Sequence, residues 1–251
     1  MDIEVLPFVF FLVALFYSSV GFGGGSSYLA ILSLFIADFY EIRSTALLLN
    51  ICVVSIGTLI FIRKRAFSFK EFWPFLLLSI PMAYLGAQLR LTQQVFFLIL
   101  GTSLILAGGF MILKFAKYKL KSRQISLSKK LSLGGSVGFL AGMSGIGGGI
   151  YLSPILNLLG WKNPRIIASL ASLFILVNSV SGLIGLSIAG TFRVNPSLIL
   201  QLALAVILGG SIGSYLTNEK FNVQIIGNIT AVLVIYVGLR LVMLHGFGIR
   251  I

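Results

Sequence analysis

Gly21-Phe22-Gly23-Gly24-Gly25 lies inside a long apolar stretch, and Gly145-Ile146-Gly147-Gly148-Gly149 repeats the pattern 124 positions later. Three consecutive glycines are unfavourable in a helix interior, since each costs about 1 kcal/mol relative to alanine. The chain therefore interrupts two apolar segments at matching places. In a membrane protein, paired interruptions of this kind are the best indication of a substrate site that a sequence offers.

The amino-acid composition places the chain among membrane proteins. Hydrophobic residues make up 58% of the 251 residues, charged residues only 10%, and the mean hydropathy is +1.06. A soluble domain carries about 25% charged residues, so this chain has too few to cover a surface that faces water. We expect an all-α, multi-pass protein of the cell membrane, with the lipid bilayer as its surroundings.

The net charge of +13 does not indicate a nucleic-acid partner, because the basic residues are clustered between apolar spans. Such clusters follow the positive-inside rule of membrane proteins. The single cysteine, Cys52, excludes a disulfide framework and a Cys/His metal site. The acidic N-terminus lacks the positive region of a secretory signal, so we expect mature protein from residue 5 onward. The two basic stretches hold Arg63, Lys64, Arg65 and Lys70, then Lys114, Lys117, Lys119, Lys121, Arg123, Lys129 and Lys130.

Apolar segments of about 20 residues, the length that spans a bilayer, recur along the chain. A charged linker at 114–130, expected to be cytoplasmic, separates a first transmembrane repeat (1–113) from a second (131–251). The predicted segments are 5–37 and 131–159, each broken by a glycine motif, and 44–62, 72–89, 95–113, 166–188, 197–216 and 223–244.

Further landmarks recur in the same order in both halves, which indicates an internal repeat. An arginine opens the span that follows each glycine motif, and two glycines follow later in each half. The pairs are Arg43 with Arg165, Gly86 with Gly213, and Gly108 with Gly238.

The relative orientation of the two repeats depends on the broken segments. If each crosses the membrane once, each half has four crossings and the repeats are parallel. If each is re-entrant, each half has three crossings and the repeats are inverted. With a cytoplasmic linker, the inverted arrangement places Lys162, Arg165 and Lys220 inside, which the positive-inside rule favours by a small margin. We expect inverted repeats.

The glycine motifs have a chemical interpretation. Helices that resume after them, at Ser26-Ser27 and Ile150-Tyr151, expose free N–H groups at a positive dipole end. Glycines also let an anion approach the backbone closely. Two such helix starts facing each other would form an anion site. The alternative is close helix packing, because small residues line helix interfaces in membranes; the doubled motif favours the site.

Several polar side chains accompany the motifs. A guanidinium presents a planar fork of donors that suits oxyanions, although an arginine at a span end also snorkels to the interface. Amides and hydroxyls within the spans either bind a polar solute or join neighbouring helices. The candidate substrate-binding residues are Gly23, Gly24, Gly25, Ser26, Ser27, Arg43, Asn50, Gly147, Gly148, Gly149, Arg165, Ser172 and Asn178.

The acidic residues lie at or near predicted span ends, and the single histidine, His245, is close to the C-terminus. Proton-coupled pumps usually carry ionisable groups within the membrane, and this chain has none at the centre of a predicted span. A cation transporter would also need carboxylates there, so an anionic or neutral solute fits better than a cation. The chain has no paired carboxylates, Ser-His-acid set or metal cluster, and we expect neither an enzyme nor a cofactor. The acids are Asp2, Glu4, Asp38, Glu41, Glu71 and Glu219.

At these residues the sequence resembles the TauE/SafE family of sulfite-exporter permeases. The resemblance rests on the two glycine motifs, on Ser153-Pro154 after the second, and on the basic central linker, and it covers nearly the whole chain. It implies export of small sulfur-containing anions, such as sulfite or organosulfonates, with Gly21 through Gly25 and Gly145 through Gly149 as the family's motifs. Pro154 has no counterpart in the first half, so the halves are expected to contribute unequally.

We therefore expect a secondary transporter in which the two repeats alternate access to a small anion. Two alternatives remain open. The first is a passive anion channel, and the second is a non-transporting membrane subunit that docks a soluble partner through its basic linker. The sequence also leaves the solute, the coupling ion, the direction of transport and assembly into a homo-oligomer open.

Overall fold

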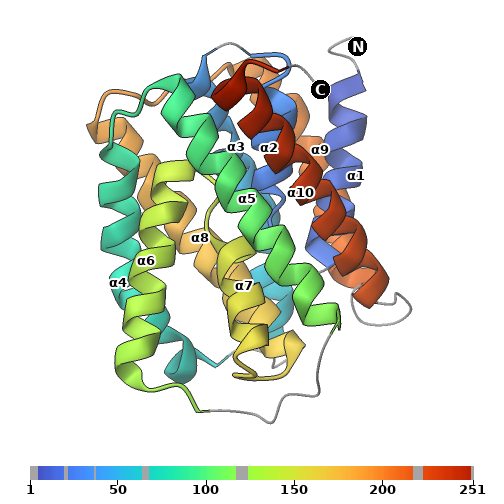
Figure 1. The fold of residues 1–251 in the computed structure, drawn as a ribbon. Helices are drawn as coiled ribbons and strands as arrows, with labels where there is room; N and C mark the ends of the chain where they lie inside the picture. The colour runs from blue at the N-terminus through green and yellow to red at the C-terminus, as the bar shows by residue number, and fades with distance from the viewer. Residues whose placement is uncertain are drawn as a thin grey trace.

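The computed structural model describes residues 5–19, 22–36, 38–63, 68–116, 124–216 and 223–249, and within them every regular element is a helix (Figure 1). The helices are α1 (Leu6–Ser19), α2 (Gly25–Leu32), α3 (Phe39–Arg63), α4 (Phe69–Gln88), α5 (Gln93–Ala116), α6 (Leu127–Ser144), α7 (Gly149–Leu158), α8 (Pro164–Ile188), α9 (Pro196–Leu216) and α10 (Val223–Phe247).

The all-helical membrane class is confirmed. Four helices are long and apolar enough to cross a bilayer, namely α3, α5, α8 and α9, and shorter apolar helices include α1 and α7. Apolar segments favour helices in lipid because a helix satisfies all of its own backbone hydrogen bonds. The predicted spans and the observed helices differ by only a few residues at most ends.

Among the described residues, helix extends into both ends of the predicted linker. Helix α5 continues to Ala116, and α6 already begins at Leu127, so helix occupies both ends of the predicted 114–130 segment. Long lysine side chains allow this, because their apolar stems lie along a helix while the ammonium groups reach water. The central part, residues 117–123, lies outside the described residues.

Both glycine motifs end one helix and begin another. Gly24, with φ of 87°, precedes α2, and Gly148, with φ of 88°, precedes α7. A positive φ is unfavourable for residues with a Cβ, so glycine is required at these turns. In Figure 1 the chain reverses direction at each break, so α1 with α2 forms a first hairpin and α6 with α7 a second.

The first helix of each hairpin packs mainly against the half of the chain that does not contain it, while α2 and α7 also contact α3 and α8 of their own halves. Helix α6 lies along α4, α1 lies along α9, α5 pairs with α10, and α3 crosses α8. Glycines allow this close contact, as expected for helices in membranes. A Cβ on Gly138 or Gly142 of α6 would collide with the backbone of α4 at Ser79 or Ala83, and one on Gly213 of α9 with that of α1.

Candidate functional site

The two glycine breaks meet inside the bundle. Gly25, the first residue of α2, is so close to the second break that an added Cβ would lie 2.9 Å from the carbonyl oxygen of Ile146. The amide nitrogen of Asn50, on α3, donates a hydrogen bond of 2.9 Å to the same carbonyl oxygen. Asn50 is completely buried. A side chain from the first half therefore holds the break of the second half in place.

The two short helices begin with free donors at this meeting point. The first hydrogen bond of α2 runs from the N–H of Tyr28 to Gly24, and that of α7 from the N–H of Tyr151 to Gly148. The N–H groups of the residues between have no acceptor within their own helix, as at any helix start. Gly25 and Gly149 are both buried. These positive helix ends can stabilise a negative charge.

Different side chains line the two breaks. A Cβ on Gly23 would lie 2.6 Å from Asn50 Oδ1 and 3.0 Å from Val54 Cγ1. The equivalent Cβ on Gly147 would lie 2.7 Å from Ile175 Cγ2 and 3.0 Å from Ser179 Oγ. The first break thus faces an amide and a valine, and the second an isoleucine and a hydroxyl, with the amide nitrogen of Asn50 also 3.3 Å from the Cβ position of Gly147. Asn50 Oδ1 and Ser179 Oγ are buried and have no hydrogen-bond partner among the described residues.

Arg43 is completely buried beside the second break. Its Nη2 donates to the carbonyl of Gly142 at 2.9 Å and lies 3.5 Å from that of Ala87. Both carbonyls belong to the last turn of a helix, α6 or α4, where intrahelical donors are missing. The guanidinium carbon also lies 5.5 Å from the centre of the Phe96 ring. Arg43 therefore ties α3 to the ends of two helices.

Two guanidinium nitrogens of Arg43, Nε and Nη1, are buried without a hydrogen-bond partner among the described residues. A buried cation is costly unless it is paired, so these donors are suited to an anion. The Cγ atom of Arg43 lies 3.4 Å from the position that a Cβ on Gly145 would take. The aliphatic stem of Arg43 therefore lies beside Gly145, the first residue of the second glycine motif, and its guanidinium contacts Gly142, three residues earlier.

Ser26 and Ser27 of α2 contact α1, the other helix of the first hairpin. The Ser27 hydroxyl donates to the phenolic oxygen of Tyr17 at 2.7 Å, and that of Ser26 donates to the same oxygen at 3.4 Å. All three residues are buried. The sequence analysis did not single out Tyr17, although a phenol within an apolar run four positions before Gly21 is a recognisable polar signal.

Three other predicted residues have different surroundings. Arg165 is exposed in the first turn of α8, and the structure does not bring it to the breaks. The Ser172 hydroxyl lies 3.1 Å from that of Thr58 and donates to the carbonyl of Val54, so it joins α8 to α3. Asn178 is buried, and neither atom of its amide has a partner among the described residues.

The predicted equivalence of Arg43 and Arg165 is wrong by about one helical turn. Gly23 meets Asn50 and Gly147 meets Ile175, which aligns α3 with α8 at an offset of 125 residues. Arg43 therefore corresponds to Ala168, whereas the sequence pairing used an offset of 122 residues. Basic residues are common at helix ends, so two arginines near the starts of two helices do not by themselves show that the positions are equivalent. The sequence offered no contact that would fix the alignment of the two helices.

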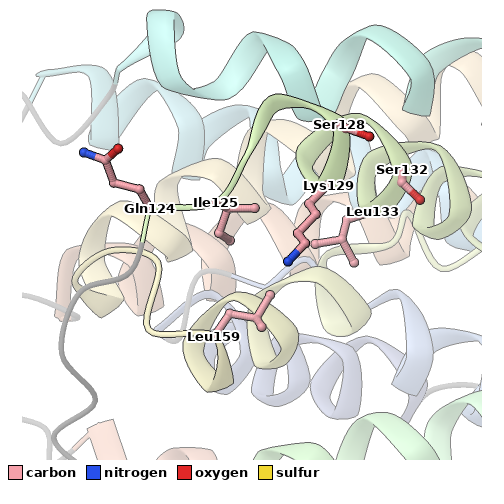
Figure 2. A pocket seen from close by; sticks show the side chains of 7 residues that line it. All are labelled: Gln124, Ile125, Ser128, Lys129, Ser132, Leu133 and Leu159. Carbon is pink, nitrogen blue, oxygen red and sulfur yellow. The ribbon is translucent and has the colours of Figure 1, made fainter.

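A pocket lies at the open end of each hairpin. At the second hairpin a pocket of about 540 Å³ is lined by Ser128, Lys129 and Ser132 of α6 and by Leu159 after α7, and Figure 2 shows the Lys129 side chain directed into it. At the first hairpin a pocket of about 480 Å³ is lined by Leu6, Asp38 and Glu41, among other residues. The two pockets therefore differ in the charge of their lining.

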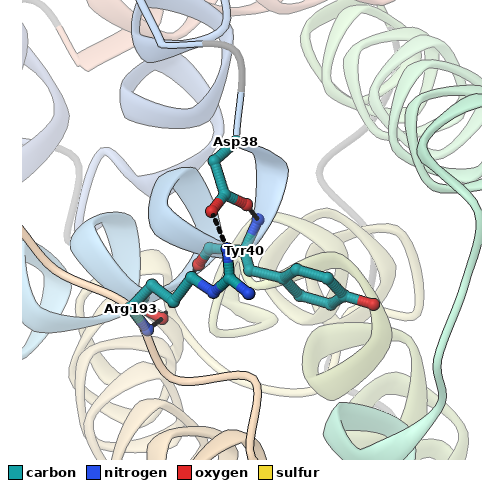
Figure 3. Close-up of polar contacts among 4 residues, drawn as sticks. Asp38, Tyr40 and Arg193 are labelled. Carbon is teal, nitrogen blue, oxygen red and sulfur yellow. Dashed lines mark hydrogen bonds and ion pairs between the residues drawn. The ribbon is translucent and has the colours of Figure 1, made fainter.

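An ion pair links the two halves near each pocket. Arg193, before α9, contacts a carboxylate oxygen of Asp38 at 2.8 Å, and the other carboxylate oxygen accepts from the backbone N–H of Tyr40 (Figure 3). Lys162, before α8, contacts Glu71 of α4 at 2.9 Å. Exposed pairs of this kind contribute about 0–1 kcal/mol. They are weak links that can open and close at little cost.

Among the described residues, no group of three His, Cys, Asp or Glu side chains is placed to hold a metal ion. The groups around the breaks include backbone N–H groups, hydroxyls and the guanidinium of Arg43, all of which can donate hydrogen bonds to an anion.

Comparison with known proteins identifies the family. The family model described as "Sulfite exporter TauE/SafE" matches residues 6–241. A protein of Sinorhizobium fredii (strain NBRC 101917 / NGR234) named "Probable membrane transporter protein y4hK" is 30% identical over 251 residues, which covers 96% of this chain and 99% of the relative. No solved structure matches. The chain belongs to the TauE/SafE family of membrane transporters, as its glycine motifs predicted, and it is a multi-pass membrane protein.

Proposed function

We propose that this protein is a secondary transporter of a small anion, a sulfur oxyanion such as sulfite or a short organosulfonate, which binds where the two glycine breaks meet. The observation that carries the proposal is the contact between the breaks, in which Gly25 and Asn50 adjoin the carbonyl of Ile146. The description of the matching family names a sulfite exporter. The donors at the breaks fit any small oxyanion.

The charge of the site supports an anionic solute. The buried Arg43 has two free nitrogens, and two helix starts offer backbone N–H groups nearby. The carboxylates of the described residues belong to Asp38, Glu41 and Glu71, all in a loop or the first turn of a helix. The net local charge at the breaks is thus positive within the described part of the chain. A cation would find no carboxylate there.

Transport is proposed to proceed by alternating access of two inverted repeats. Helices of both halves follow each other in the same order, and the contacts of α4 with α6 and of α9 with α1 correspond to each other. In Figure 1, α1 and α6 run in opposite directions, and so do α3 and α8. Inverted repeats permit two equivalent conformations, in which one repeat rocks against the other around a central site. In this proposal the ion pairs Asp38–Arg193 and Glu71–Lys162 break and re-form as each side opens and closes.

The experiment is anion uptake into proteoliposomes, with labelled sulfite and with a short sulfonate, for Gly148→Leu and for Gly190→Leu. Both glycines have positive φ, 88° and 69°, but a Cβ on Gly148 meets Phe174 and Ala141, whereas one on Gly190 meets nothing within 4 Å. Both variants incur the strain of a positive φ, but only Gly148→Leu also places a side chain against the residues around the second break. Only Gly148→Leu is therefore expected to abolish uptake. Equal uptake by both variants would contradict the proposal.

Counterflow of labelled anion separates a carrier from a channel. A carrier exchanges internal unlabelled for external labelled anion and shows transient accumulation, whereas a channel shows none. Binding of the anion is measured independently by thermal shift of the purified protein, because a ligand that binds the folded state raises its stability. A screen of oxyanions and sulfonates then identifies the preferred solute.

A further inference from the structure

A groove lies on the outer side of the first hairpin, between α1, α2 and α10, with Ser27 of α2 in its lining. It has a volume of about 280 Å³, and its lining includes Val9 of α1, Ala30 of α2 and Leu244 of α10. Leu34 and Tyr236 also line it and are 52% and 57% exposed. Exposed apolar side chains on the outer surface of a membrane-spanning bundle face lipid, so the groove opens toward the bilayer.

Among the described residues that line this groove, Arg240 is the only charged one. It lies seven residues before the end of α10 at Phe247, which corresponds to roughly 10 Å along the helix. The side chain is half-buried, and within the described part of the chain it has no hydrogen bond or ion pair. An ionisable residue within a membrane helix marks a functional site by default, because its charge is costly there without a partner.

The other polar groups in the lining are already engaged. The Ser27 hydroxyl donates to Tyr17, and the Ser33 hydroxyl donates to the carbonyl of Ala30 at 2.7 Å. The groove therefore offers one cationic fork surrounded by apolar side chains. A small oxyanion needs several donors, whereas a molecule with one anionic group and a hydrocarbon chain matches this arrangement. Tyr236, one turn before Arg240 on α10, adds a largely exposed aromatic ring to the lining.

We propose that this groove binds an acidic phospholipid, with its phosphate on Arg240 and part of an acyl chain between α1, α2 and α10. A bidentate contact of arginine with phosphate is among the strongest hydrogen-bonded pairs. The equivalent position in the first half, by the offset that relates Gly108 to Gly238, is the uncharged Phe110.

The test uses delipidated protein in detergent, with phosphatidylglycerol or phosphatidylcholine added at equal concentrations. Native mass spectrometry measures bound lipid, and thermal unfolding measures stabilisation. We expect wild type to bind phosphatidylglycerol in preference to phosphatidylcholine, and Arg240→Gln to lose the preference with a roughly tenfold to hundredfold weaker Kd, as for the loss of one charge-assisted hydrogen bond.

Arg90→Gln is the matched control, because Arg90 is an exposed arginine outside the groove that donates to the carbonyl of Ala189. It removes the same charge and is expected to behave as wild type. Val9→Phe narrows the groove and leaves Arg240 intact, and it is expected to reduce lipid binding as well. Equal phosphatidylglycerol binding by Arg240→Gln and wild type would overturn the proposal. So would equal stabilisation by soluble glycerol 3-phosphate, which would place a headgroup-sized anion there without a lipid.

Discussion

The two glycine breaks have nearly the same sequence but different surroundings. The first is lined by Asn50 and Val54, and the second by Ile175 and Ser179, with the buried Arg43 beside it. Asn50 reaches from the first break to the carbonyl of Ile146 in the second. The symmetric backbone thus provides two helix starts, and asymmetric side chains give them different charge and polarity. An anion bound there would be held mainly from the Arg43 side.

The largest effect on this asymmetry is expected from Arg43→Met, which removes the cation and keeps a side chain of similar length. Uptake should fall about tenfold to hundredfold, since hydrogen bonds to charged groups contribute about 1.5–3 kcal/mol. The unfolding temperature should fall modestly, because the carbonyl of Gly142 loses its donor, while removal of a buried charge offsets part of that loss.

Arg165→Met provides the control, because Arg165 is exposed. It should leave both uptake and unfolding temperature unchanged. If Arg43→Met instead unfolds the protein while Arg165→Met does not, the role of Arg43 is to hold the ends of α4 and α6. The proposal that Arg43 binds the anion at the second break would then be contradicted.

A second, smaller difference is expected between Gly25→Ala and Gly149→Ala. A Cβ on Gly25 would collide with the amide of Asn50 and with the backbone at Ile146, neither of which can move freely. A Cβ on Gly149 would mainly meet the flexible end of Ile175. Gly25→Ala should therefore reduce uptake and unfolding temperature more than Gly149→Ala. The opposite ranking would mean that the second break is the more tightly packed of the two.

The smallest effect is expected from Asn50→Ile, which makes position 50 identical to its counterpart Ile175. The loss of the hydrogen bond to Ile146 leaves a buried carbonyl unpaired, at a cost of about 1–3 kcal/mol. Adding Ile175→Asn supplies an amide from α8 to the same region, so the double variant should recover part of the lost stability and uptake. Unfolding temperature and uptake of both variants test this. No recovery would show that the two positions are not interchangeable.

The sequence predicted the helices well because their length and polarity are set locally. Apolar runs of membrane length interrupted by three glycines leave few alternatives, and α1 with α2 and α6 with α7 follow the two interrupted segments. The glycine pairing of Gly86 with Gly213 also has a structural basis, since Gly86 packs on the backbone at Phe139 and Gly213 on that at Leu15. Small residues at crossings are a local signal that survives in sequence.

The partners of the polar side chains could be identified only from the tertiary structure. Ser172 proved to join two helices, Arg165 proved to be exposed, and Tyr17 and the carbonyl of Gly142 became visible only as contacts. A buried polar group has the same identity in sequence whether it binds a neighbouring helix or a solute. Only its contacts in the folded chain, or the lack of them, distinguish the two.

By itself, then, the sequence determined the membrane class, the family, the positions of the helices and the two places where the chain must turn. These follow from hydrophobic length and from the need for glycine at positive φ. The tertiary structure decided that the two turns meet, that Asn50 bridges them and that Arg43 rather than Arg165 is buried beside them. The physical reason is that helix register and crossing are fixed by contacts between residues about 100 positions apart, such as Arg43 with Gly142 and Asn50 with Ile146.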